Sequence, residues 1–208
     1  QGCGLNLDYS RDIVFHNCTQ REIDSISKLS FSDEEISFCS IVRDVPHKNI
    51  KGCIEFCENF TKIFNKKVSL YITSDKYTSN SITIKSIIGL SDPEIDKIYK
   101  KSHFNLLLSL DHTHRGFVEG FGLTCIEASI VGTPSIVMNT GGLPENVHHQ
   151  RNGFVISNTD YKSVNSLSEI LNDETYRRLR EESYSHTKQS HSFEVYKSFI
   201  KKVINEFK

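Results

Sequence analysis

Short apolar runs alternate along this chain with segments whose apolar residues recur at helical spacing, and this alternation constrains the fold more than any other feature. The sequence predicts strands over residues 36–42, 68–73, 81–88, 104–110, 135–138 and 153–156. It predicts helices over residues 49–64, 92–101, 123–131 and 193–207. Because strands that alternate with helices form a parallel sheet covered on both faces, we expect a three-layer, Rossmann-like α/β domain with a mainly parallel sheet of about six strands. Such sheets bind ligands beyond the carboxyl ends of their strands.

Charge and hydropathy exclude several classes of protein. The 208 residues include 25 basic and 26 acidic side chains, a net charge of −1, so we expect no broad basic surface for nucleic acid. No apolar run approaches the roughly 20 residues that span a bilayer, so we expect no transmembrane segment. The chain begins at Gln1 without a signal sequence, and we interpret it as a fragment of a longer protein.

The cysteines favour a reduced protein. Six cysteines occur, none of them in a C-x-x-C pair. Cys53 and Cys57 share one face of an expected helix, which suits either half of a zinc site or two thiols in the core. We favour the core thiols, since free cysteine packs as a small hydrophobic residue. Reduced thiols indicate a cytoplasmic location, and we expect no metal and no other cofactor.

Residues 119–128, EGFGLTCIEA, follow a strongly apolar strand and open a helix. Gly120 and Gly122 let the backbone approach a ligand closely, and the unpaired N–H groups of a helix start can hold an anion such as phosphate. Glu119 lies before the helix and Glu127 about one turn inside it, so the two carboxylates can contact opposite ends of an extended ligand. Taken alone, the same residues also suit an ordinary glycine-containing turn with an acidic helix start.

The surrounding motifs resemble the donor-binding half of retaining GT-B glycosyltransferases, and more narrowly glycosyltransferase family 4, whose mark is two glutamates separated by seven residues. The residues that carry this resemblance are Ser109, Glu119-Gly-Phe-Gly-Leu, Glu127-Ala, Gly132-Thr-Pro, Gly141-Gly-Leu-Pro-Glu and Asn152-Gly. Residues 41–49, IVRDVPHKN, match the loop in which the family places an arginine and, five residues later, a lysine. Residues 111–118 lengthen the loop ahead of the first glutamate relative to the usual spacing. The resemblance covers residues 36–156.

The resemblance implies roles for individual residues. Arg43 and Lys48 would bind the donor diphosphate and stabilise the negative charge on the leaving group without a metal. The alternative is that both are solvated cations of a surface loop. Glu119 would lie near the sugar ring, and with the two cations it completes the implied catalytic set. Glu127 would accept hydrogen bonds from the ribose hydroxyls. Further substrate contacts are implied for Gly120, Phe121, Gly122 and Leu123 at the sugar and phosphate, and for the backbone near Lys85 at the base.

The resemblance also implies how a full enzyme is organised. Residues 1–35 would form an interdomain connector and lead-in, residues 36–208 the nucleotide-sugar-binding domain, and an acceptor-binding domain would precede this chain. A nucleoside diphosphate sugar would be the donor, and an acceptor sugar or glycolipid would receive the sugar in polysaccharide or glycoconjugate synthesis. Peripheral membrane association of the full protein is compatible with this function, and this chain alone is expected to be inactive.

Two alternatives to the transferase remain open at this point. One is a sugar-nucleotide epimerase of the same GT-B fold. The other is a non-catalytic nucleotide- or sugar-binding module that kept the fold. An ordinary dinucleotide-binding domain is disfavoured, because no G-x-G-x-x-G follows the first strand.

Overall fold

A computed structural model describes residues 18–19, 26, 28–111, 117 and 119–206 of the chain. These residues form a six-stranded sheet in the order β3-β2-β1-β4-β5-β6, and every neighbouring pair of strands is parallel. The strands are β1 (Glu35–Ser40), β2 (Lys67–Ile72), β3 (Thr83–Ser86), β4 (Phe104–Leu107), β5 (Ser135–Met138) and β6 (Gly153–Ile156). The Rossmann-like α/β fold predicted from the sequence is confirmed. The strand order reverses between β1 and β4, the place where such folds bind ligands.

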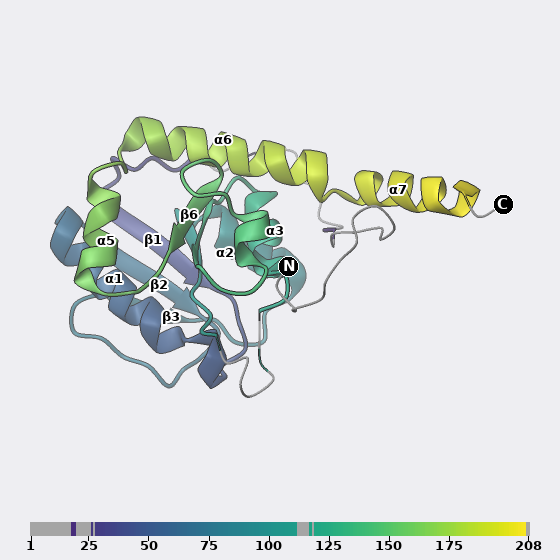
Figure 1. The fold of residues 1–208 in the computed structure, drawn as a ribbon. Coiled ribbons are helices and arrows are strands. Elements are labelled where there is room, and N and C mark those ends of the chain that lie inside the picture. Colours follow the sequence, from purple (N-terminus) through teal and green to yellow (C-terminus); the bar gives the residue numbers. More distant parts are fainter. Residues whose placement is uncertain (1–17, 20–25, 27, 112–116, 118, 207–208) are drawn as a thin grey trace.

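Helices cover both faces of the sheet (Figure 1). They are α1 (Ile50–Phe64), α2 (Asp92–Lys100), α3 (Leu123–Ser129), α4 (Leu143–Asn146), α5 (Tyr161–Ser168), α6 (Asp173–Ser190) and α7 (Phe193–Glu206), with a 3₁₀ turn η1 at Pro46–Lys48. Helix α1 packs against α5, whereas α2 packs against α3, and α3 packs against α6. The adjacent residues Phe38 and Cys39 of β1 belong to two separate apolar clusters, because successive side chains of a strand point to opposite faces.

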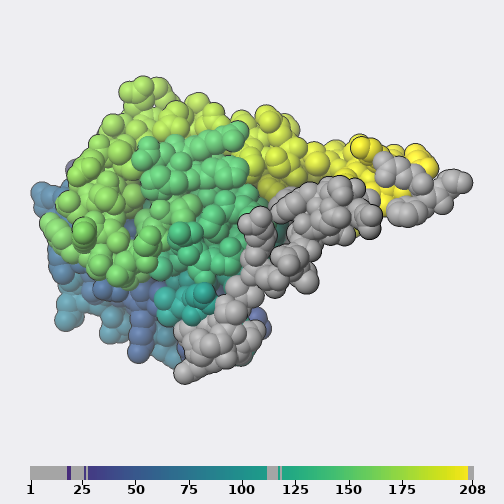
Figure 2. Space-filling view, in the orientation of Figure 1, coloured from purple at the N-terminus to yellow at the C-terminus, as the bar shows by residue number. Residues whose placement is uncertain are grey.

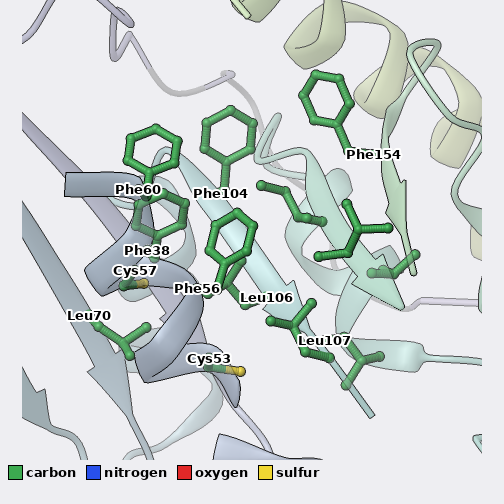
Figure 3. Close-up of a cluster of buried hydrophobic side chains, with 14 of the residues drawn as sticks. Phe38, Cys53, Phe56, Cys57, Phe60, Leu70, Phe104, Leu106, Leu107 and Phe154 are labelled. Carbon is green, nitrogen blue, oxygen red and sulfur yellow. The ribbon is translucent and has the colours of Figure 1, made fainter. Parts of the chain in front are cut away.

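The larger apolar cluster lies between the sheet and α1 (Figure 3). Phe38 of β1 meets Phe60 of α1 edge to face, with ring centroids 5.0 Å apart. Cys53 and Cys57 of α1 are fully buried in the same cluster, and burial raises the pKa of the Cys53 thiol to about 11. The interpretation of these two residues as core thiols is therefore confirmed. No group of three or more His, Cys, Asp or Glu suited to a metal occurs within the described ranges.

Strands β1, β3 and β4 end at least two residues earlier than the apolar runs predicted. Strand β1 ends at Ser40 and β4 at Leu107, and β3 covers only Thr83–Ser86. Beyond β4 the backbone bonds to a loop instead of continuing the ladder, since the N–H of Leu110 donates to the carbonyl of His47 at 2.8 Å. The apolar side chains past the strand ends are thereby available to line a site at this edge of the sheet.

Residues before β1 and after α6 complete the described structure. Phe31 packs on Phe60 with its ring centroid 6.3 Å away, so the chain just before β1 contributes to the core. Within the predicted connector and lead-in at residues 1–35, residues 1–17, 20–25 and 27 lie outside the described residues. Helix α7 continues beyond α6 and projects from the body of the domain (Figures 1 and 2). Among the described helices, none combines the length and the hydropathy needed to cross a membrane.

Candidate functional site

The loop after β1 carries Arg43 and Lys48, and its first half is fixed by Asp44. The Asp44 carboxylate accepts hydrogen bonds from the Ser74 hydroxyl at 2.8 Å and from the Tyr77 hydroxyl at 3.0 Å. The Ser74 hydroxyl, followed by Lys76 and Tyr77, holds the pKa of Asp44 below its ordinary value. Asp44 therefore stays ionised and ties the backbone beside Arg43 to the loop after β2.

The second half of this loop is fixed by Asn49. Asn49 adopts a left-handed conformation with φ 55°, and its side chain caps α1 by accepting from the N–H of Gly52 at 3.1 Å. The same side chain donates to the carbonyl of Leu108, just past β4, at 3.0 Å. Asn49 thus couples the start of α1 to the neighbouring strand end and brings Lys48 next to the loop that follows β4.

The glycine-rich loop between β4 and α3 is built on close backbone approaches. The N–H of Gly142 donates to the carbonyl of Glu119 at 2.9 Å. A Cβ atom at Gly142 would lie 2.1 Å from the carbonyl oxygen of Gly120, so only glycine fits there. Gly122 precedes α3 with φ 78°, a conformation that favours glycine. The glycine pattern of the sequence is therefore explained by the backbone shape that presents Glu119.

Lys48 and Glu119 form an ion pair at the reversal of strand order. The Nζ atom of Lys48 donates to Oε2 of Glu119, and the Ser109 hydroxyl donates to the same oxygen at 3.3 Å. The two charged side chains are only 17% and 12% exposed, so Lys48 is not a solvated surface cation. Arg43 is exposed, and its guanidinium has no hydrogen-bond or ion-pair partner among the described residues. One cation is thus held in place and the other remains available to a ligand.

Two hollows adjoin at the carboxyl ends of the strands and share Ile41, Val42 and Arg43. The first encloses about 340 Å³ and is also lined by Lys48, Leu107, Glu119, Phe121, Gly122, Leu123 and Thr124. The second encloses about 440 Å³ and is also lined by Thr73, Ile87, Ile88, Gly89, Leu90 and Ile95. The first hollow is charged at its base, whereas the second is mainly aliphatic, so the two can accept chemically different parts of one extended ligand.

Most of the residues predicted for the site lie in the first hollow. Its lining contains Arg43, Lys48, Glu119, Phe121, Gly122 and Leu123. Lys85 lines neither hollow, because its ammonium group lies against Tyr71, 3.2 Å from the hydroxyl. The contact between the base and the backbone near Lys85 stays a prediction, and residues shortly after β3 line the second hollow. Gly120 shapes the loop without lining either hollow.

Glu127 lies in α3, one helical turn after Thr124, and lines neither hollow directly. Its Oε2 atom accepts a hydrogen bond from the hydroxyl of Tyr99 at 3.3 Å. Thr124 contributes a hydroxyl that has no hydrogen-bond partner among the described residues. Nearby, burial raises the pKa of the Cys125 thiol to about 12, so this cysteine stays protonated and is a poor nucleophile. The chemistry available here belongs to carboxylates, cations and hydrogen-bond donors.

The supporting contacts of two asparagines were not predicted from the sequence. Asn146 of α4 donates its side-chain amide to the carbonyl of Phe121. The side-chain amide of Asn152 in turn donates to the carbonyl of Asn146 at 2.9 Å. Asn152 therefore supports the glycine-rich loop indirectly, through Asn146. The signal available in the sequence was the presence of short polar residues at two turn positions, which does not indicate the partner of either side chain.

The doubly wound parallel sheet, with a cationic loop after β1 and a glycine-rich loop with two glutamates after β4, defines a Rossmann-like α/β domain whose polar residues gather at the carboxyl ends of the strands. The family model for glycosyl transferases group 1 matches residues 22–186. The chain therefore belongs to the glycosyl transferases group 1 family.

Curated relatives and solved structures agree with this assignment. The chain is 29% identical over 136 residues to the capsular polysaccharide biosynthesis glycosyltransferase CapM of Staphylococcus aureus, an alignment that covers 61% of this chain and 35% of the relative. It is 40% identical over 57 residues to a GDP-mannose-dependent alpha-(1-6)-phosphatidylinositol monomannoside mannosyltransferase of Mycobacterium tuberculosis, covering 27% of this chain and 15% of the relative. The chain thus spans about a third or less of the length of these relatives.

Structural comparison confirms the fold. A crystal structure of a mutant of S. aureus TarM in complex with fondaparinux, alpha-GlcNAc-glycerol and UDP superposes with a TM-score of 0.65 at 21% identity. The match covers 89% of this chain and 37% of TarM. The chain therefore has the architecture of one Rossmann-like half of a GT-B glycosyltransferase.

Proposed function

We propose that this chain binds the nucleoside diphosphate sugar donor of a retaining glycosyltransferase, whose sugar is transferred to an acceptor hydroxyl in polysaccharide or glycoconjugate synthesis. The observation that carries the proposal is the convergence of Arg43, Lys48 and Glu119 on one hollow of about 340 Å³ at the reversal of strand order. Two cations and a carboxylate around one hollow suit a diphosphate joined to a polyhydroxyl sugar.

The two hollows divide the donor between them. In this arrangement the diphosphate lies beside Arg43, which lines both hollows. The sugar occupies the first hollow beside Glu119, and the base occupies the aliphatic second hollow near Ile87 and Leu90. Glu127 accepts hydrogen bonds from the ribose hydroxyls between them. The unpartnered hydroxyl of Thr124 supplies a further donor for a phosphate oxygen.

Charge stabilisation explains how these groups promote transfer. When the bond between sugar and diphosphate breaks, negative charge grows on the leaving diphosphate. Arg43 and Lys48 face that charge, and their interaction with it is stronger in the transition state than in the ground state. Lys48 is already fixed by its ion pair with Glu119, so it needs little reorganisation when the donor binds. The departing group is thereby stabilised by the chain's own cations.

The whole enzyme requires more than this chain. We place acceptor binding, for an acceptor sugar or glycolipid, in a second domain of the full protein. In this division residues 36–208 bind the nucleotide sugar and residues 1–35 connect the two domains. The epimerase and the non-catalytic module make different predictions: an epimerase alters the free donor, and a binding module shows no transfer when an acceptor domain is supplied.

Calorimetric titration with a panel of nucleoside diphosphates tests the proposal. We expect saturable 1:1 binding of at least one member, and no loss of affinity when a chelator removes divalent ions, because Arg43 and Lys48 supply the positive charge. Absence of binding across the panel would contradict donor binding. A large loss of affinity with chelator would contradict the role given to the two cations while leaving donor binding intact.

A further inference from the structure

Tyr99 is a tyrosine whose hydroxyl reaches the second glutamate of the site. It lies at the end of α2 with its side chain 0% exposed. Its hydroxyl is 3.3 Å from Oε2 of Glu127, on the neighbouring helix α3. A buried tyrosine hydroxyl requires a hydrogen-bond partner, and here that partner is a partly exposed carboxylate. The contact therefore runs from the interior of the domain to the edge where the site lies.

The position of the Tyr99 ring is fixed by its surroundings. The ring belongs to the smaller apolar cluster, together with Ile98 and Val131. The backbone carbonyl of Tyr99 accepts from the hydroxyl of Thr133 at 2.8 Å and from the N–H of Ser102 at 3.0 Å. Ring and backbone are thus held independently, so the hydroxyl is presented at a nearly constant position.

A fixed donor matters because ordering a glutamate side chain has an entropic cost. A free glutamate side chain loses rotamer entropy when it is ordered by a ligand, and prior ordering removes that cost from binding. A carboxylate has about four acceptor positions, so accepting from Tyr99 leaves capacity for both hydroxyls of a ribose. Ile95, one turn before Tyr99, lines the second hollow, and Thr124, one turn before Glu127, lines the first. The contact is therefore adjacent to both hollows.

We infer that Tyr99 is a positioning residue: its hydroxyl orients the Glu127 carboxylate toward the ribose hydroxyls and so sets the preference of the site for ribonucleotides over deoxyribonucleotides. The inference rests on the proposed function, because it requires Glu127 to contact the ribose. It adds a polar residue of α2, the helix that also contributes Ile95 to the lining of the second hollow.

The test compares affinities for UDP and for 2′,3′-dideoxy-UDP in the 208-residue chain, with GDP and 2′,3′-dideoxy-GDP as a second pair. The variants are Tyr99→Phe, Glu127→Ala and the double variant, with Tyr184→Phe as the control. Tyr184 packs against the same cluster, and its hydroxyl accepts from Lys188 rather than from a site residue. Thermal unfolding of each variant shows whether it folds. The readout is the dissociation constant of the dideoxynucleotide divided by that of the ribonucleotide. A loss of stability alone does not change this ratio.

The wild-type ratio should be roughly tenfold or more, and Tyr99→Phe should lower it by about three- to tenfold, as expected for one lost orienting hydrogen bond. Tyr184→Phe should leave it unchanged. Glu127→Ala should bring it close to one, and adding Tyr99→Phe should then have no further effect. A wild-type ratio retained in Tyr99→Phe while Glu127→Ala abolishes it would overturn the role of Tyr99 and leave the proposed function standing. A ratio unaffected by Glu127→Ala, or no binding of either ribonucleotide, would overturn both.

Discussion

His103 at the amino edge of the sheet and Arg43 at the carboxyl edge differ in whether their polar groups have partners. At the amino edge, the fully buried His103 accepts from the N–H of Ser37 at 3.0 Å through Nδ1, and its Nε2 lies 3.0 Å from the carbonyl of Ser30. At the carboxyl edge, the Arg43 guanidinium and the Thr124 hydroxyl lack partners among the described residues. Satisfied buried groups contribute to stability, whereas unsatisfied groups around a hollow are available to a ligand. The comparison assigns stability to one edge and recognition to the other.

The largest expected effect is the loss of nucleotide affinity on removing Lys48. Lys48→Ala should weaken binding of a nucleoside diphosphate by about 1.5–3 kcal/mol, or roughly 10- to 150-fold, because a charge-assisted contact to phosphate is lost. Calorimetric titration measures this change. Lys51→Ala is a matched control, since Lys51 is an exposed lysine three residues along the same loop and helix start. Equal nucleoside diphosphate affinities of Lys48→Ala and Lys51→Ala would contradict a specific role of Lys48 in binding.

At the opposite edge, His103→Ala should lower stability and spare binding. The Ser37 N–H would lose its acceptor in a buried position, at a cost of about 1–3 kcal/mol in the free energy of unfolding. Denaturant unfolding measures this cost, and titration of the folded variant should give a nucleoside diphosphate affinity within about twofold of the wild type. A variant of unchanged stability but weakened affinity would reverse the assignment of the two edges.

The same histidine makes stability depend on pH. Burial lowers the pKa of His103 below its ordinary value of 6.5, so the unfolded chain binds this proton more readily than the folded chain does. Its contribution to stability is complete above pH 6.5 and is lost as the pH falls below that value toward the folded pKa. Melting temperatures of wild type and His103→Ala should therefore converge as the pH is lowered from 7.5 to 5.5. A constant difference between them would contradict a neutral, buried His103.

The smallest expected effect concerns the support of the Arg43 loop. Asp44→Asn keeps the size of the side chain but weakens its contacts with Ser74 and Lys76, so nucleotide affinity should fall by less than in Lys48→Ala. Because the pKa of Asp44 lies below 3.8, its support is complete above that pH and is lost only under more acidic conditions. Titration of Asp44→Asn beside Asp75→Asn, an exposed neighbour, measures the effect. Identical behaviour of the two variants would show that the loop needs no such support.

The fold could be predicted because its signal is local. Apolar periodicity in short windows marks strands and helices, and alternation of the two leaves little choice of topology. The meeting of Lys48 with Glu119 also follows from that topology, since loops after neighbouring parallel strands share one edge of the sheet. The ends of β1 and β3 could not be predicted, because the apolar residues that follow these strands line the hollows.

The contacts that orient the site were beyond sequence reasoning for a different reason. Tyr99 occupies an ordinary apolar position of its helix, and nothing in the pattern indicates that its hydroxyl faces Glu127, 28 residues away. Asp44 resembles any charged loop residue until Ser74 and Tyr77 are seen beside it. The contact of the Lys85 ammonium group with the Tyr71 hydroxyl likewise could not be read from the sequence. The partner of a side chain depends on how helices, strands and loops pack together. The spacing of residues along the sequence does not determine that packing.

The central claim, that the carboxyl edge binds a nucleoside diphosphate sugar in a defined direction, is tested most directly with the two glutamates. UDP and UDP-glucose, and GDP and GDP-mannose as a second pair, are titrated into Glu127→Ala and Glu119→Ala. Glu127→Ala should weaken binding of the bare and the sugar-bearing nucleotide alike, by about 1–3 kcal/mol.

Glu119→Ala should leave binding of the bare nucleotide nearly unchanged, because Glu119 lies beside the sugar rather than the nucleotide, and it should weaken binding of the sugar-bearing donor. Equal losses for the bare nucleotide in both variants would contradict this direction of binding. So would wild-type affinity for every ligand in both variants.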